Sequence, residues 1–159
     1  MYPPVEPNLN YETEDTIYFF TWPFYPLDNY SAHQILIWWR VFATVEHAYQ
    51  WKKFSVEYPD IAEEIFNAKS PEQVKNISIK NHDKTPTSWH NEKVAIMKEI
   101  LYSKTSQHED VRDILLKTGN KNLAENSPID AFWWIGPDGN GESMVGKIWV
   151  EIRENLRLL

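Results

Sequence analysis

The sequence predicts an α+β fold that is mainly α-helical, arranged as a single compact domain with a small β-sheet. The two segments that read as strands, residues 16–21 and 34–42, both lie in the N-terminal part of the chain. The rest carries repeated helix-start signals, each followed by apolar residues at helical spacing. A length of 159 residues fits one ordinary domain.

The composition excludes several classes of protein. Sixteen Lys and Arg against 23 Asp and Glu give a formal net charge of −7, so the chain lacks the basic surface that grips nucleic-acid backbones. An acidic enzyme can still act on a nucleotide or on a nucleic-acid end. The absence of cysteine excludes disulfides, thiolate catalysis and cysteine-ligated metals. With no secretory signal and no long apolar run, we expect a cytoplasmic, intracellular protein without a membrane partner.

The N-terminal elements come first. Residues 1–15 contain three prolines and are expected to form an extended arm, followed by a domain over residues 16–159. Residues 16–21 are rich in β-branched and aromatic side chains and predict a strand. A second extended segment is predicted over residues 34–42, and we expect the two segments to pair in a small sheet.

Helices are predicted from residue 45 onward. Thr44 is expected to cap a helix over residues 45–57, and Asp60 a short helix through Phe66. Ser70, followed by Pro and then Gln, matches a helix-start signature.

Further start signals follow along the chain. Ser88 is expected to cap a long amphipathic helix, and Ser106 a helix that ends at Thr118 and the next glycine. Ser127 predicts one more turn, and a final helix is expected over about residues 146–157.

The predicted helix over residues 45–57 carries three polar side chains on one narrow face. Glu46, Gln50 and Lys53 are spaced i, i+4, i+7, and the residues around them are mostly aromatic. Burial of such a face would raise the pKa of a carboxyl and lower that of a lysine, which suits proton transfer or imine chemistry. On spacing alone, a functional site and a structural ion pair are equally open.

Four of the five glycines fall between residues 136 and 146. Such a loop lets backbone amides approach a phosphate, but it matches neither the Walker A nor the dinucleotide pattern, and a plain turn is the preferred explanation of the glycines taken alone. Its position just after Asp130, Trp133 and Trp134 places a carboxylate and two indoles beside the loop.

The five histidines show no zinc-ligand spacing, so no metal site and no cofactor are predicted. His47, next to Glu46, is interpreted as a packing or orienting residue. Trp89, taken alone, is typical of a core position.

Together these segments resemble the NADAR superfamily, the N-glycosidases typified by the riboflavin-intermediate N-glycosidase of bacteria and plants. The resemblance rests on elements that occur in the family's order between Ile17 and Arg153: Thr44-x-Glu46-His47-x-x-Gln50-x-x-Lys53-Phe54, Leu27-Asp28-Asn29-Tyr30, Trp89 with Met97, Thr118-Gly119 with Leu123-x-Glu125, and Asp130-x-x-Trp133 through Gly141, Gly146 and Arg153. Three positions depart from the family pattern, namely Asp28, Trp134 and Ser143. The departures lie mostly at the predicted ligand loop, so they bear on the substrate more than on the reaction.

The resemblance implies hydrolysis of the C1–N bond between a 5′-phosphorylated ribose and an exocyclic amine. The substrates implied are ribosylamino-pyrimidine intermediates of riboflavin synthesis or ADP-ribose attached to guanine, so the partner is a nucleotide-type small molecule or an ADP-ribosylated base of DNA or RNA. We favour the ADP-ribosyl substrate, because Trp134 would offer a stacking surface for adenine. The alternatives are a non-catalytic ADP-ribose-binding module and a structural protein whose aromatics form only core.

The resemblance and the polar helix face together imply a set of roles. Lys53 is expected to be the amine nucleophile that forms an imine, and Glu46 the general acid and base. In a simpler alternative, Glu46 activates water directly and Lys53 only lowers its pKa. The substrate-binding residues are expected to be Asn29, Gln50, Trp89, Asp130, Trp133, Gly139 and Gly141, the two glycines through amides that meet phosphate.

Overall fold

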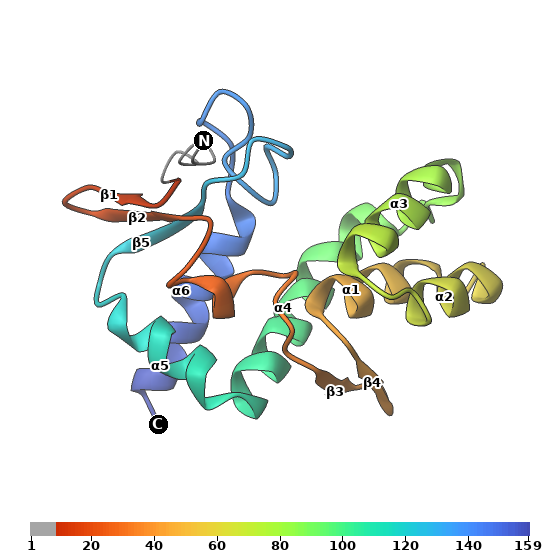
Figure 1. The fold of residues 1–159 in the computed structure, drawn as a ribbon, viewed down its shortest axis with the longest axis horizontal. Coiled ribbons are helices and arrows are strands. Elements are labelled where there is room, and N and C mark those ends of the chain that lie inside the picture. Colours follow the sequence, from red (N-terminus) through yellow and green to blue (C-terminus); the bar gives the residue numbers. More distant parts are fainter. Residues whose placement is uncertain (1–8) are drawn as a thin grey trace, which may run out of the picture. The chain divides into compact units, whose positions relative to one another are not determined.

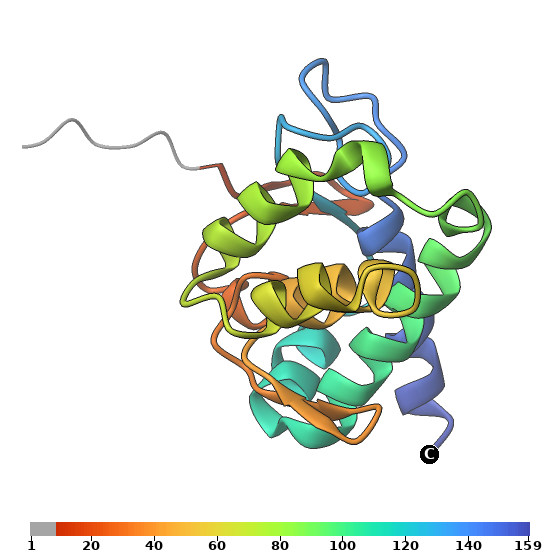
Figure 2. The same cartoon turned by 90° about the vertical axis from the view of Figure 1, so that its right-hand side faces the viewer.

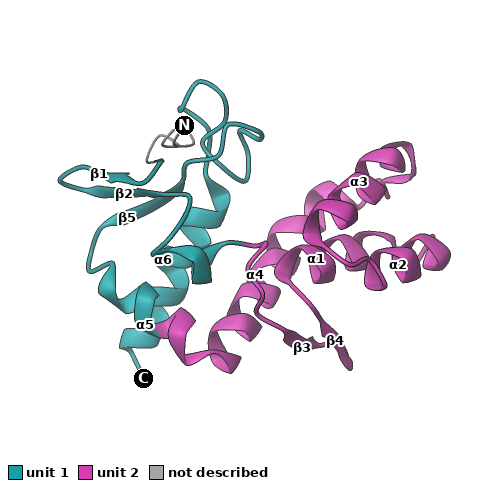
Figure 3. Ribbon diagram, viewed as in Figure 1, with its two compact units in different colours: residues 1–28, 113–159 teal, residues 29–112 magenta. Residues whose placement is uncertain are grey.

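The computed structural model describes residues 9–159. Helices dominate and the strands are short, which confirms the mainly helical α+β class (Figure 1). The chain divides into two compact units (Figure 3): unit 1 combines the described part of residues 1–28 with residues 113–159, and unit 2 holds residues 29–112. Residues 1–8 of the predicted arm lie outside the described residues, and the domain boundary at residue 16 stays a prediction. Within residues 9–159, no helix combines the length and the apolarity that crossing a bilayer requires.

Unit 1 is built on a three-stranded sheet of β1 (Tyr11–Glu12), β2 (Thr16–Phe19) and β5 (Asn122–Glu125), in the order β1-β2-β5. β2 pairs antiparallel with β1 and parallel with β5, where Ile17 lies opposite Leu123. The sequence predicted β2, but β5 was missed, because four residues ending in Ala-Glu carry little strand signal.

Helix α6 (Met144–Arg157) packs against β5. A side chain at Gly146 would place its Cβ 1.8 Å from the carbonyl oxygen of Leu123, so only glycine permits this close approach. Farther along α6, the Trp149 indole donates to the carbonyl of Leu27 at 3.1 Å, in the 3-10 helix η1 (Tyr25–Leu27). These contacts hold the chain that follows the glycine loop firmly onto the sheet.

Unit 2 begins with a hairpin of β3 (Ile35–Ile37) and β4 (Arg40–Phe42). The expected pairing between residues 16–21 and 34–42 is therefore wrong. The second segment folds back on itself at Trp38 and Trp39, whose φ values of 50° and 64° form a tight left-handed turn. Asn and Gly are the usual signals for such a turn, and two tryptophans conceal it. The outer side of β3 is covered by the Gln107 side chain, which accepts from the Leu36 amide at 2.8 Å and donates to its carbonyl at 2.9 Å.

Four helices complete unit 2: α1 (Val45–Phe54), α2 (Pro59–Phe66), α3 (Pro71–Lys80) and α4 (Trp89–Gln107), with the 3-10 helix η2 (His82–Lys84) before α4. Both α2 and α3 pack against α1, and α4 contacts α1 as well (Figure 2). A cluster of buried residues holds the first three together; it comprises Phe54, Ala62, Ile65 and Val74. Helix α1 is thus surrounded, which explains why its polar residues are buried.

Thr44 and Ser70 cap α1 and α3 as predicted, each hydroxyl accepting a backbone N–H at 3.2 Å. Asp60 is not a cap, because α2 begins at Pro59, whose fixed φ suits the first helical position. Ser106 does not start a helix either: it lies within α4, where its hydroxyl donates to the Ser103 carbonyl.

Two further predictions change at the C-terminal side. Helix α5 (Glu109–Lys117) begins only after a break at His108, and it carries the chain from unit 2 into unit 1. The turn predicted at Ser127 forms no helix.

Candidate active site

Helix α1 places the three predicted polar residues where they are withdrawn from solvent. The side chains of Glu46 and Gln50 are each 4% exposed, and Lys53 is half-buried. The Thr44 cap sets the start of the helix and therefore the face on which these residues emerge. A surface stripe, the simplest alternative, is excluded by this burial.

A continuous chain of hydrogen bonds runs from the carboxylate to the amine. Gln50 Nε2 donates to Glu46 Oε1 at 2.9 Å, and Gln50 Oε1 accepts from Ser78 Oγ at 2.7 Å. Lys53 Nζ in turn donates to Ser78 Oγ at 3.2 Å. The structure therefore brings together the residues singled out on α1 and adds Ser78, from α3, to them.

Ser78 was missed by the sequence analysis. Apart from ending the tripeptide Asn76-Ile77-Ser78, it belongs to no motif, so nothing in the sequence marked it as a site residue. Its burial against the polar face of α1 distinguishes it, but the packing of α3 against α1 was not predictable from one sequence.

The Lys53 ammonium lies in surroundings that disfavour its charge. Burial is the main cause that lowers the pKa of Lys53 below its ordinary value, and repulsion from Lys75 and Lys93 lowers it further. Attraction by Glu46 opposes these effects without cancelling them. A larger fraction of this lysine is thus neutral at a given pH, and only the neutral amine is nucleophilic.

Asn29 lies directly beside Glu46. Its side chain is 3% exposed, and its backbone carbonyl accepts from the Glu46 amide at 3.2 Å. Its Nδ2 group contacts the Met97 sulfur at 3.9 Å, while the amide oxygen, Oδ1, has no hydrogen-bond partner among the described residues. A buried acceptor without a partner is uncommon in folded proteins and indicates a group reserved for a ligand or water.

A groove of about 520 Å³ opens between α1 and α4. Lys53 and Trp89 both line it, and Trp89 is 5% exposed with its ring 5.0 Å from that of Tyr49. The remaining lining residues mix charged and apolar types: Lys52, Val56, Glu57, Pro86, Ser88, Asn91, Glu92, Ala95 and Ile96. A ligand in this groove would meet the amine that ends the hydrogen-bond chain.

The other predicted site residues belong to unit 1. Asp130 Oδ1 accepts from the backbone amides of Phe132 and Trp133, at 2.8 and 2.6 Å, so this carboxylate shapes the turn that it begins. Trp133 is partly exposed, with its ring 4.9 Å from that of Phe132. The roles of both residues toward a substrate stay predictions.

The glycine loop uses its own amides. Gly141 N donates to the Ile135 carbonyl at 2.7 Å and Gly139 N to that of Gly136 at 3.3 Å. A Cβ at Gly141 would lie 2.6 Å from the Trp134 carbonyl oxygen, and Gly139 has a φ of +75°. Tight folding thus accounts for both glycines, and neither amide is available to a phosphate while these bonds hold. Beside the loop lies a cavity of about 400 Å³, which Gly139 and Gly141 help to line.

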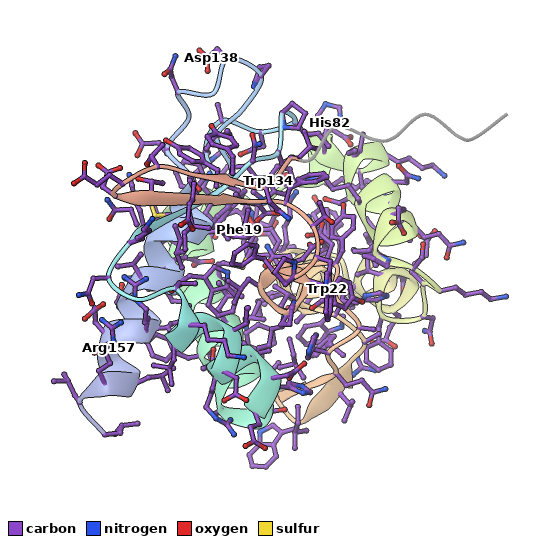
Figure 4. The ribbon with its side chains drawn as sticks, turned by 60° about the vertical axis from the view of Figure 1, so that its left-hand side comes forward. Phe19, Trp22, His82, Trp134, Asp138 and Arg157 are labelled. Atoms are coloured by element: carbon purple, nitrogen blue, oxygen red, sulfur yellow. The ribbon has the colours of Figure 1, made fainter. Side chains whose placement is uncertain are left out.

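Trp134 does not offer the stacking surface expected of it. Its side chain is 8% exposed, and Figure 4 shows it inside the unit, with Asp138 at the outer tip of the loop. Since the ring is covered, it cannot stack on an adenine, and the preference for an ADP-ribosyl substrate loses the observation on which it rested.

His33, His47 and His108 are held by hydrogen bonds within the protein. His47 Nε2 bonds to the Ala68 carbonyl and its Nδ1 to the Thr44 hydroxyl. Burial lowers the pKa of His47, which favours its neutral form and a packing role. His33, His108 and Asp110 approach one another despite their distance in sequence. Both nitrogens of His33 and one of His108 already take part in hydrogen bonds, to Ser31, Asp110 and the Gln34 carbonyl.

Comparisons with known proteins identify the family of this chain. The NADAR domain matches residues 11–157, and the chain belongs to the NADAR family. It is 37% identical to the N-glycosidase Npun_R5314 of Nostoc punctiforme over 91% of this chain and 94% of that protein. It is 30% identical to the N-glycosidase YbiA of Escherichia coli over 82% of this chain and 80% of that protein.

A longer relative and a solved structure extend these matches. The chloroplastic riboflavin biosynthesis protein PYRR of Zea mays is 31% identical over 97% of this chain, which spans 27% of that protein. The NMR structure of E. coli YbiA superimposes with a TM-score of 0.78 and 27% identity, covering 94% of this chain and 89% of that one. The protein is an enzyme, a hydrolase of the N-glycosidase type, and its substrate is a small molecule of the nucleotide class.

Proposed function

We propose that this enzyme hydrolyses the C1–N bond between a 5′-phosphorylated ribose and an exocyclic amine, with Lys53 as nucleophile and Glu46 as general acid and base. The observation that carries the proposal is the partly buried amine with a lowered pKa, joined by hydrogen bonds to a buried carboxylate and opening into a groove. Burying ionisable groups is costly, so their retention beside a groove favours a catalytic role.

The reaction follows from the glycosylamine character of the substrate. Opening of the ribose ring leaves a C1=N imine, which neutral Lys53 attacks at C1 to form a geminal diamine. The Glu46 carboxylate takes the proton that the attacking Lys53 nitrogen releases and gives it to the departing amine, and C1 stays bound to Lys53 as an imine. The Glu46 carboxylate then takes a proton from water as the water oxygen adds to C1, and collapse releases the sugar and restores the lysine.

In this mechanism Asn29 would bind the ribose. Its unpartnered Oδ1 is a hydrogen-bond acceptor beside Glu46, and ribose hydroxyls are donors. Trp89 lines the groove although most of its ring is covered, so it would form only an edge of the wall beside the substrate.

Two substrate classes fit the reaction. The names of the maize relative and of a Vibrio vulnificus relative, both riboflavin biosynthesis proteins, favour the ribosylamino-pyrimidine phosphate. The ADP-ribosyl adduct of guanine is the second candidate. It is favoured by the lysines near the groove, since Lys75 and Lys93 act on Lys53 and Lys52 lines the groove, and several cations suit a diphosphate.

The test is hydrolysis of both substrates, followed by mass spectrometry, with matched variants. We expect Glu46→Ala and Lys53→Ala to abolish product, whereas Glu64→Ala and Lys80→Ala, on exposed helix positions, retain it. Release of ribose 5-phosphate identifies the pyrimidine substrate and release of ADP-ribose the guanine adduct. Borohydride added during turnover should trap a sugar on Lys53 in the wild type. Substantial activity of Lys53→Arg, which keeps the charge but forms no imine, would contradict the covalent step and leave direct attack of water.

A further inference from the structure

The hydrogen bonds between Glu46 and Lys53 have a fixed direction. An ionised carboxylate only accepts, so Gln50 must turn its NH₂ group to Glu46 and its carbonyl oxygen to Ser78. The Ser78 proton is thereby committed to Gln50, and only the lone pairs of Ser78 Oγ face Lys53. Lys53 can therefore only donate to Ser78.

This direction matters for a nucleophile. A neutral lysine has two N–H groups and one lone pair. When one N–H is held by Ser78, the lone pair points elsewhere and is free for an electrophile. If the chain ran the other way, the Ser78 hydroxyl would donate to that lone pair and block it.

From this geometry we propose that Ser78 is a positioning residue that keeps the lone pair of Lys53 exposed as long as Glu46 is ionised. The role rests on the proposed function, in which Lys53 is the nucleophile. The sequence analysis assigned Gln50 to substrate binding. In this proposal it instead links Glu46 to Ser78, because both ends of its amide are engaged within the protein.

The spacer also separates the two charges. Seven residues of helix correspond to about 10 Å of rise, so the backbone positions of Glu46 and Lys53 lie about two turns apart. An amide does not readily pass a proton from one end to the other. The hydrogen-bond chain therefore fixes the orientation of the side chains but does not transfer protons between Glu46 and Lys53. The other charged groups near Lys53 are Lys75 on α3, Lys93 and Glu92 on α4, Lys52 on α1, and Glu57 in the turn that follows α1.

The first test measures turnover. Ser78→Ala should lower kcat about tenfold with KM changed less than about threefold, because the amine is still present but no longer held. Ser78→Thr keeps the hydroxyl and should restore most of kcat, while Ser106→Ala, an exposed serine on α4, serves as the matched control. A kcat of Ser78→Ala within twofold of wild type would overturn the proposal.

The second test does not need turnover, and so separates failure of this inference from failure of the proposed function. The rate at which acetic anhydride acetylates Lys53, followed by peptide mass spectrometry from neutral to high pH, gives the limiting reactivity of the neutral amine. Glu46→Gln should lower this limiting rate several-fold in the wild-type background but by less than twofold in Ser78→Ala, since the hydroxyl that blocks the lone pair is then missing. An equal effect in both backgrounds would overturn the role of Ser78, even if no ribosylamine were cleaved. If Ser78→Ala proves unfolded by thermal denaturation, Ser78→Cys, whose thiol is only a weak hydrogen-bond donor, repeats the cycle.

Discussion

Two regions carry the features that looked functional in the sequence, and they use their polar groups in opposite ways. In the α1 region, polar side chains bond to one another in a chain that leads to an amine in a groove. In the glycine loop, the Asp130 carboxylate and the amides of Gly139 and Gly141 are engaged in folding the loop itself. The comparison teaches that residue type and spacing identify candidates, whereas the partner of each polar atom decides which of them can act.

The largest effect is expected in the α1 region. Glu46→Gln or Lys53→Ala should lower kcat by about 10³-fold, in the range of a lost acid–base or nucleophilic group. Steady-state assays of N-riboside hydrolysis would measure it, with thermal unfolding to show that the variants are folded. If either variant kept more than a tenth of the activity, the polar groups of α1 would be structural, like those of the glycine loop, and not catalytic.

Close packing at the end of the loop is the next largest target. Gly146→Ala should destabilise the protein by about 3 kcal/mol, because its Cβ would meet the Leu123 carbonyl oxygen at 1.8 Å and β5 or α6 would have to move. Gly139→Ala, with open space but a φ of +75°, should cost only about 1 kcal/mol. Urea denaturation measures both. In the folded Gly139→Ala enzyme kcat should be unchanged, and a large loss there would restore a phosphate role to the loop.

The pH dependence of stability sharpens the contrast. The pKa of Lys53 is lowered in the folded protein, chiefly by burial, so the unfolded chain binds more protons over the pH range between the two pKa values. Stability should therefore rise with pH through that range, and Lys53→Met should remove this part of the dependence. At neutral pH the variant should melt about 2 °C higher, as measured by calorimetry across about pH 6 to 11, which includes the pKa of lysine in the unfolded chain. A lower melting temperature in Lys53→Met would mean that the ammonium is stabilised where it lies.

The smallest effect is expected at Asp130. Asp130→Asn keeps the oxygen that accepts from the two turn amides, so stability should change by less than about 0.5 kcal/mol. If the carboxylate only shapes the turn, kcat and KM should also stay near their wild-type values. A clear increase in KM would instead favour the predicted contact with a substrate hydroxyl.

Sequence reasoning reached the helices and the α1 face because both depend on local signals. Capping residues such as Thr44 and Ser70 act within four residues, and helical spacing fixes which side chains share a face. These features do not require knowledge of what packs against the helix.

Long-range features escaped for the same reason. The parallel pairing of Ile17 with Leu123 joins strands far apart in the chain, and Ser78 reaches Lys53 only because α3 folds beside α1. The burial of Trp134 likewise depends on how the loop closes. No local pattern contains that information.

The Gln107 side chain has a consequence for self-association. A two-stranded hairpin presents unpaired backbone groups on its outer sides, and such an edge can recruit a strand from another molecule. By bonding both the amide and the carbonyl of Leu36, Gln107 occupies the place where that strand would add. The last turn of α4 thus covers the edge of the hairpin at Leu36, a residue that is 58% exposed, and leaves no unpaired backbone group there for an incoming strand.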